Sequence, residues 1–140
     1  MAYFSFAKRI LGGEPIQLYN YGEMYRDFTY IDDITSAMRR LVFCLPASCG
    51  AGGSALRYKV YNIGGGCAEH LLFFIETLEK ALGKTAVLEM CPMQPGDVHR
   101  TFADTSDLEA DFGFAPSVRI EEGLGRFVRW YREYYKLQGD

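Results

Sequence analysis

The segment at residues 22–33 reads GEMYRDFTYIDD, and it carries a cation, Arg26, among aromatic side chains. The alternation from Arg26 to Ile31 predicts a β-strand, because successive side chains of a strand face opposite ways. Asp32 and Asp33 follow where a helix would begin and where a negative charge stabilises its N-terminus. We therefore expect a strand followed by a helix, with an arginine that needs an acidic partner.

Two kinds of partner would neutralise Arg26. One is an internal carboxylate, supplied by Asp27, Asp32 or Asp97. The other is the phosphate of a ligand, since a guanidinium matches phosphate oxygens with paired, charge-assisted hydrogen bonds. The residues of this segment leave both partners open.

The composition is that of a globular protein with no attraction for polyanions. The chain has 140 residues, of which 49% are hydrophobic and 24% charged, and a chain of this size buries a substantial core. Its formal net charge is -3, so it lacks the basic field that nucleic-acid binders use. We expect a single domain over residues 1–140 and no nucleic-acid partner.

The sequence has no membrane-spanning or metal-binding pattern. No window approaches the roughly 18 apolar residues of a membrane span, and the first residues lack the basic region of a secretory signal. We therefore expect a cytoplasmic protein with no membrane partner. The cysteines form no C-x-x-C pair and have no histidine at zinc-finger spacing, so we expect reduced thiols and no metal. They are Cys44, Cys49, Cys67 and Cys91.

Hydrophobic periodicity predicts alternating helices and short strands. The expected helices cover residues 1–11, 33–45, 68–82, a short stretch ending at 111, and 120–135. The expected strands cover residues 15–19, 26–31, 59–63 and 86–91. Residues 46–57 are rich in glycine and small side chains, which predicts a flexible loop. The predicted fold class is α/β, with short strands and four to five helices.

A run of glycines, Gly64-Gly65-Gly66, follows the expected strand at 59–63 and has the outline of a phosphate-binding turn. The G-x-G-x-x-G spacing requires a small residue where Glu69 stands. A carboxylate at the start of the next helix would also repel a phosphate. We interpret the run as a plain tight turn with no cofactor.

The sequence shows no arrangement typical of a catalytic centre. His70 and His99 are the two histidines, and neither is surrounded by serine, cysteine or carboxylate residues in a hydrolase pattern. The aromatic residues of segment 127–135 repeat at helical spacing, which is typical of core packing. We therefore assign no catalytic residue to this chain.

Several blocks, taken in order, resemble one family. They are QLYN at 17–20, RDFTYIDDI at 26–34, YNIG at 61–64, PMQPGDV at 92–98, ADTS at 103–106 and IEEG at 120–123. Together they resemble the C-terminal, substrate-binding part of the NAD-dependent nucleotide-sugar epimerases and dehydratases, which are extended short-chain dehydrogenases/reductases. The MQPGDV loop and the WYR sequence at 130–132 bring the resemblance closest to the UDP-glucuronate 4-epimerases.

The resemblance implies a lobe that holds a UDP-sugar. Arg26 would contact the diphosphate, and the resemblance thus favours the phosphate over the internal carboxylate. Gln17 and Tyr19 would border the uracil. Gln94 and Asp97 would reach the ribose and the phosphate side.

The family's glycine-rich NAD turn and its catalytic Tyr-x-x-x-Lys are not found in this sequence, where none of the ten tyrosines has a lysine four residues later. The resemblance therefore implies a chain that begins after the family's catalytic half, binds no NAD by itself and is inactive alone. Its partner would be a separate NAD-binding half, or a second copy covering the face of the arginine strand and the following helix. The alternatives are a free-standing nucleotide-binding or protein-interaction module without catalysis, and a structural remnant with no ligand.

Overall fold

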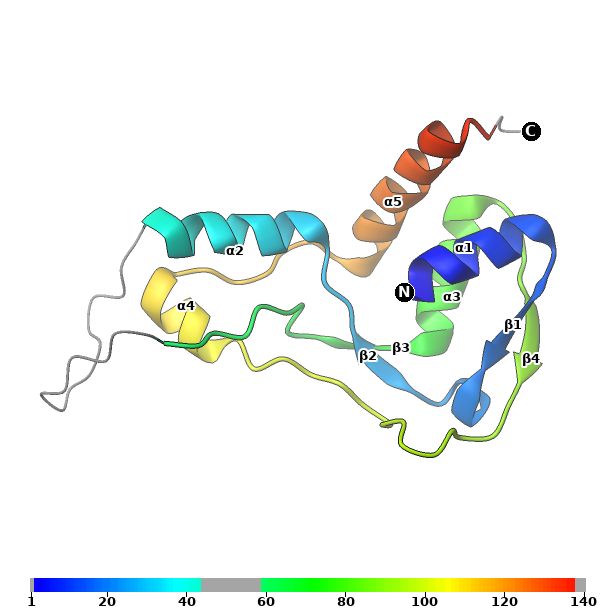
Figure 1. Ribbon diagram of the computed structural model, residues 1–140, viewed down its shortest axis with the longest axis horizontal. Coiled ribbons are helices and arrows are strands. Elements are labelled where there is room, and N and C mark those ends of the chain that lie inside the picture. The colour runs from blue at the N-terminus through cyan, green and yellow to red at the C-terminus, as the bar shows by residue number, and fades with distance from the viewer. Residues whose placement is uncertain (1, 44–58, 138–140) are drawn as a thin grey trace, which may run out of the picture. The chain divides into compact units, whose positions relative to one another are not determined.

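The computed structural model describes residues 2–43 and 59–137, and Figure 1 shows the order of their helices and strands. These residues form two compact units that alternate along the chain. Unit 1 comprises Met1–Arg26, Glu69–Thr101 and Arg119–Asp140, and unit 2 comprises Asp27–Ala68 and Phe102–Val118. The flexible loop predicted at 46–57 lies outside the described residues. The single domain expected over residues 1–140 stays a prediction.

Unit 1 contains most of the regular structure. Its elements are α1 (Ala2–Gly12), β1 (Pro15–Leu18), a 3-10 helix η1 (Tyr19–Gly22), α3 (Leu71–Leu82), β4 (Val87–Met90) and α5 (Ile120–Tyr135). Two further strands, β2 (Tyr25–Asp27) and β3 (Ala68–His70), pair with each other where the two units meet in the sequence.

The parallel pairing of β1 with β4 fixes which side chains are neighbours at this edge of unit 1. The register sets Ile16 opposite Leu88 and Gln17 opposite Glu89. Successive side chains of β1 alternate, so Ile16 and Leu18 are buried whereas Gln17 is exposed. The exposed face of this small sheet therefore carries a glutamine beside a glutamate.

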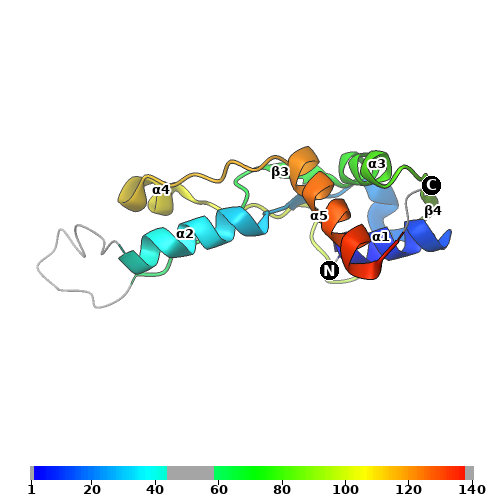
Figure 2. The same cartoon turned by 90° about the horizontal axis from the view of Figure 1, so that it is seen from above.

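The core of unit 1 lies between its helices. α3 packs against α5 and α1, as Figure 2 shows from above. α3 ends at Leu82, and the next residue, Gly83, caps it with a φ of 66°, a left-handed conformation that glycine adopts without strain. The side chains with the least exposure are those of Ala7, Ile10, Ile16, Leu18, Phe74, Ile75, Leu78 and Leu82.

The aromatic tail on α5 divides between core and surface. Tyr131 is buried and its ring meets that of Phe4 edge to face at 5.3 Å. Trp130 and Tyr134 stack on each other at 5.3 Å but are exposed. Core packing therefore describes only one side of this helix.

Unit 2 is built around α2 (Ile31–Phe43) and α4 (Ser106–Phe112). Its core consists of Ala37, Leu108 and Phe114. Asp33, in the first turn of α2, is buried and accepts hydrogen bonds from the backbone amides of Ser117 (3.1 Å) and Val118 (3.0 Å). The two consecutive aspartates thus do stand in the first turn of a helix, and one of them holds a distant segment.

The predicted strand at residues 59–63 is wrong. This segment is held by side chains rather than by a backbone ladder. The ammonium of Lys59 and the hydroxyl of Tyr61 each donate to Asp111 at 2.6 Å, and the Asn62 amide donates to the carbonyl of Asp104 at 3.1 Å. These side-chain hydrogen bonds hold the segment in place without a strand paired to it.

Several predicted boundaries also shift. β2 ends at Asp27, earlier than the predicted Ile31, because the Asp27 carboxylate turns to accept backbone amides of unit 2. The helix predicted from residue 68 begins at Leu71, whose amide donates to the carbonyl of Met24 at 2.8 Å. The helix predicted from residue 33 begins at Ile31. Within the described residues, the α/β class, the five α-helices and the short strands agree with the predicted class of short strands with four to five helices.

Candidate functional site

Arg26 and Asp97 form an ion pair in unit 1. Nη2 of Arg26 lies 2.9 Å from Oδ1 of Asp97. Nη1 donates to the carbonyls of Tyr25 at 2.9 Å and of His99 at 3.4 Å. The two charged side chains retain 24% and 32% of their exposure. Of the partners open to Arg26, an internal carboxylate is therefore present, and it is Asp97.

The loop at residues 92–97 places Asp97 through its backbone. Gly96 has a φ of 85°, which a side chain would make strained, and the Asp97 amide donates to the carbonyl of Gln94 at 3.2 Å. β2 then holds the end of this loop, because the amide of Tyr25 donates to the carbonyl of His99 at 2.8 Å. The guanidinium and the carboxylate thus come from two segments that share backbone hydrogen bonds.

Gln17 and Tyr19 form a second polar group on the β1 side of unit 1. The Gln17 amide nitrogen donates to Oε2 of Glu89 at 3.2 Å. The hydroxyl of Tyr19 donates to Oε1 of Gln17 at 3.4 Å. The structure therefore joins the five predicted site residues into two groups: Gln17 with Tyr19, and Arg26 with Asp97 and the Gln94 backbone.

A turn at residues 20–24 between β1 and β2 is predicted from the sequence, but its left-handed backbone conformation is a feature that sequence reasoning missed. Asn20, Tyr21 and Gly22 have consecutive positive φ angles of 49°, 53° and 83°. The Asn20 amide donates to the carbonyl of Glu23 at 2.7 Å and lies 3.3 Å from Nδ1 of His99. An asparagine two residues before a glycine is the available sequence signal, because both adopt this conformation most readily.

The glycine run in unit 2 surrounds a carboxylate of the protein. Oδ2 of Asp27 accepts hydrogen bonds from the amides of Gly66 (3.1 Å) and Ala103 (3.0 Å). A Cβ on Gly65 would lie 2.4 Å from Oδ1 of Asp27 and 2.4 Å from the carbonyl oxygen of Phe28. The space over these glycines is filled by the chain itself, so the turn does not fit the pyrophosphate of NAD.

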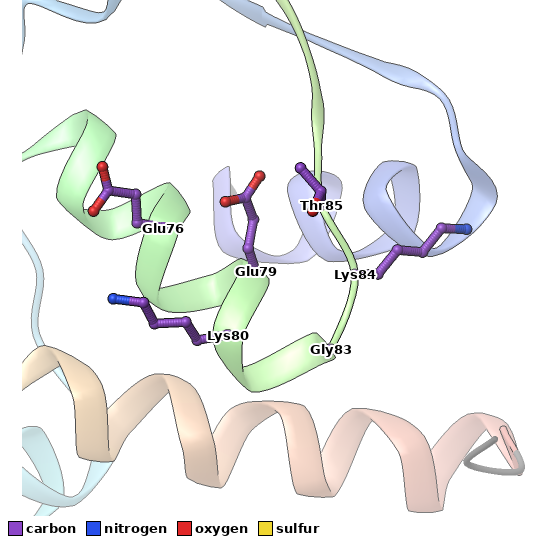
Figure 3. Close-up of a pocket in the computed structure, with 6 residues that line it drawn as sticks. All are labelled: Glu76, Glu79, Lys80, Gly83, Lys84 and Thr85. Carbon is purple, nitrogen blue, oxygen red and sulfur yellow. The ribbon is translucent and has the colours of Figure 1, made fainter.

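A surface depression of about 390 Å³ lies at the C-terminal end of α3, and Figure 3 shows its lining. Two of its polar side chains already stabilise the fold. Oε1 of Glu79 accepts the amide of Ala86 at 2.6 Å, and Nζ of Lys84 donates to the carbonyl of Leu11 at 2.7 Å. The depression therefore offers few free groups to a ligand, and the candidate site stays with Arg26.

The described part of the chain shows no metal centre and no membrane span. Over residues 2–43 and 59–137, no three His, Cys, Asp or Glu side chains come together as metal ligands. Within the same ranges, no helix has the length and apolar character to cross a bilayer.

Comparison with known proteins shows to which proteins this chain is related. Protein CapI of Staphylococcus aureus is 46% identical over 97% of this chain and 43% of its own length. A probable UDP-glucuronate 4-epimerase of Rhizobium meliloti strain 1021 is 46% identical over 97% of this chain and 42% of its own. The chain is homologous to the C-terminal part of the UDP-glucuronate 4-epimerases.

Solved structures with a similar fold include an epimerase of the same kind. The UDP-glucuronic acid 4-epimerase of Bacillus cereus, solved in complex with UDP-glucuronic acid and NAD, superimposes with a TM-score of 0.81 and 28% identity. The superposition covers 96% of this chain and 40% of that one. No protein-family model matches the chain. The chain thus spans less than half the length of the epimerases that it matches.

Proposed function

We propose that this chain binds a UDP-sugar and that unit 1 holds the nucleotide. The observation that carries the proposal is the half-buried guanidinium of Arg26, positioned by two backbone carbonyls and by Asp97. Such a fixed, partly exposed fork suits the oxygens of a diphosphate. The Asp97 carboxylate is an acceptor for a ribose hydroxyl. The homologous epimerase solved with UDP-glucuronic acid supports UDP-glucuronate as the first sugar to test.

The nucleotide would reach both polar groups of unit 1. In the proposed complex Gln17 and Tyr19 border the uracil, Arg26 contacts the diphosphate, and Gln94 and Asp97 lie on the ribose and phosphate side. The sequence between these groups is short, because η1 begins at Tyr19 and β2 is the next element along the chain. The strained turn at Asn20 and Tyr21 would set the path of the chain between base and phosphate.

The proposal assigns binding, and not turnover, to these 140 residues. No tyrosine of the chain is followed by a lysine four residues later, and the glycine turn encloses Asp27 instead of a dinucleotide. NAD would accordingly be held by a separate polypeptide segment, as the NAD-dependent relatives require. UDP-sugar would bind here, and epimerisation would need that further part.

Calorimetric titration with UDP, UDP-glucuronate and NAD tests the proposal. UDP and UDP-glucuronate are expected to bind and NAD is not. Arg26→Ala is expected to weaken UDP binding by about tenfold or more, because a charge-assisted hydrogen bond contributes about 1.5 to 3 kcal/mol. Arg129→Ala, which removes an exposed arginine of α5 in the same unit, is the matched control and should leave the affinity unchanged.

The alternative is a protein-interaction module without a nucleotide ligand, and the outer face of α2 favours it. Ile31, Met38 and Val42 are 58%, 54% and 74% exposed on this helix. With Thr35 they repeat at intervals of four, three and four residues, the spacing of a helix-pairing stripe. Absence of binding to UDP and UDP-glucuronate, together with self-association through α2, would establish this alternative instead.

A further inference from the structure

We infer that Glu89 is a positioning residue that sets the base preference of this site by fixing the orientation of the Gln17 amide. The inference rests on the proposed function, in which Gln17 borders the base. It assigns a role to a residue of β4 that has no contact with the ligand in that proposal.

The parallel register of β1 and β4 places Gln17 beside Glu89. Gln17 and Glu89 are direct partners in the sheet, and both side chains lie on its exposed face. Their side chains meet at 3.2 Å between Nε2 of Gln17 and Oε2 of Glu89. A slip of one residue would turn Gln17 to the buried face, so the core residues on either side of it hold this pair in register.

Hydrogen-bond chemistry then decides the amide orientation. An ionised carboxylate accepts hydrogen bonds and donates none, whereas a glutamine amide has a donor end and an acceptor end. Glu89 therefore binds the NH2 group of Gln17 and turns Oε1 the opposite way. The Tyr19 hydroxyl, which donates to that Oε1 at 3.4 Å, agrees with the same orientation.

The fixed orientation presents acceptors to the base. Oε1 of Gln17 is an acceptor, and the Tyr19 oxygen, having donated its proton to Oε1, is another. Uracil carries an N–H at N3, where cytosine carries a lone pair. A site that faces N3 with acceptors therefore binds uracil and leaves the cytosine nitrogen opposite another acceptor, which is unfavourable.

A swap of the two partners tests the role of Glu89. The parent chain is expected to bind UDP about tenfold more tightly than CDP, the value of one net hydrogen bond. Glu89→Gln allows either amide to donate, so Gln17 turns freely and the ratio of the two dissociation constants approaches one. In Gln17→Glu/Glu89→Gln the carboxylate at 17 again presents an acceptor to the base, and the preference for UDP returns.

The ratio of UDP to CDP affinity separates positioning from a structural role. A damaged fold would weaken both nucleotides alike and leave their ratio unchanged, and both share the diphosphate that Arg26 would bind. Any of three results overturns this inference alone. They are a parent chain without preference for UDP, an unchanged ratio in Glu89→Gln, and a double variant that does not recover the preference. Absence of binding to both nucleotides by the parent chain overturns the proposed function as well.

Discussion

Asp27 is the next residue along the chain from the candidate ligand residue Arg26, yet its contacts belong to unit 2. Its Oδ2 joins the turn at Gly66 to the backbone at Ala103, with hydrogen bonds of 3.1 and 3.0 Å. The two neighbouring charges of the sequence motif thus have separate tasks. Arg26 faces Asp97 in unit 1, and Asp27 holds together two segments that are far apart in the sequence.

Replacement of Asp27 by alanine is expected to lower the free energy of unfolding by about 2 kcal/mol, because two backbone amides lose their acceptor. Urea denaturation followed by circular dichroism measures the change. Asp27→Asn keeps one acceptor oxygen and should cost less. Equal stability of the alanine variant and the parent chain would contradict this account of the carboxylate.

Asp111 gives unit 2 a dependence on pH. Hydrogen bonds from Lys59 and then from Tyr61 hold the pKa of this carboxyl below its ordinary value of 3.8, and Lys59 has a raised pKa in turn. A carboxyl with a depressed pKa in the folded state stabilises that state above the ordinary pKa. The stabilisation is lost as the pH falls from about 4 through the folded-state value.

Melting temperatures between pH 7 and pH 2 measure this contribution. The parent chain is expected to lose stability more steeply below pH 4 than Asp111→Asn, because the amide does not titrate. Parallel curves for the two proteins would show that the Lys59–Asp111 contact has no effect on the folded state in solution.

At the scale of elements, the glycine turn and the last helix give opposite expectations for the same substitution. A Cβ on Gly65 would meet the Phe28 carbonyl at 2.4 Å, whereas nothing lies within 4 Å of one on Gly125 in α5. Gly65→Ala should therefore destabilise the protein by about 1 to 3 kcal/mol through overpacking. Gly125→Ala should stabilise it by about 0.5 to 1 kcal/mol, since alanine favours a helix interior.

The same denaturation experiment compares the two alanine variants. Because both replace a glycine by one methyl group, any general effect of the substitution is shared. A stabilising Gly65→Ala would mean that Asp27 and Phe28 do not enclose this turn.

The exposed stripe of α2, formed by Ile31, Thr35, Met38 and Val42, is expected to mediate self-association of the 140-residue chain. Asp32 and Arg39 flank this stripe towards its two ends. An antiparallel pair of α2 helices would bury both stripes and bring Asp32 of one copy near Arg39 of the other. Burial of apolar side chains and complementary charge both favour such a pair.

Sedimentation velocity at increasing protein concentration measures the association. Met38→Glu should shift the equilibrium to the monomer, because the charge would be buried against an apolar stripe. Glu121→Gln, an exposed change in α5, serves as the control. A strictly monomeric parent chain at high concentration would contradict self-association.

The local sequence pattern predicts several helices and strands correctly, but it fails where a segment is held by contacts with a distant part of the chain. α1 and α5 have strong helical periodicity and were located nearly to the residue, and β1 and β4 follow from short apolar runs bounded by glycine and proline. Residues 59–63 have a similar strand pattern but pair with no strand in the part of the chain that the structure describes. Lys59, Tyr61 and Asn62 instead bind α4 and its start through side chains, a partner that local pattern does not reveal.

At the scale of the whole molecule, ligand binding is expected to raise stability selectively. A ligand at 100 times its dissociation constant adds about 2.7 kcal/mol to the free energy of unfolding. UDP-glucuronate should therefore raise the melting temperature of the parent chain, whereas NAD should leave it unchanged. The Arg26→Ala variant separates binding at the proposed site from a general anion effect, because it should lose the shift with UDP-glucuronate.

Incubation of UDP-glucuronate with the 140-residue chain and NAD measures turnover directly. We expect no UDP-galacturonate product, because no tyrosine of the chain has a lysine four residues later. Formation of the 4-epimer by this polypeptide would overturn the assignment of binding without catalysis.

The sequence by itself determined the resemblance to the epimerases and most of the helices and strands, because ordered blocks such as RDFTYIDD and PMQPGDV and the helical periodicity are local properties. It also identified Arg26 as a charge in need of a partner. Only the tertiary structure decided that this partner is Asp97, that Asp27 fills the glycine turn, and that Glu89 meets Gln17. Each of these contacts joins residues that are far apart in the chain. Backbone hydrogen bonds and strand register bring these residues together, and the sequence pattern alone does not specify either.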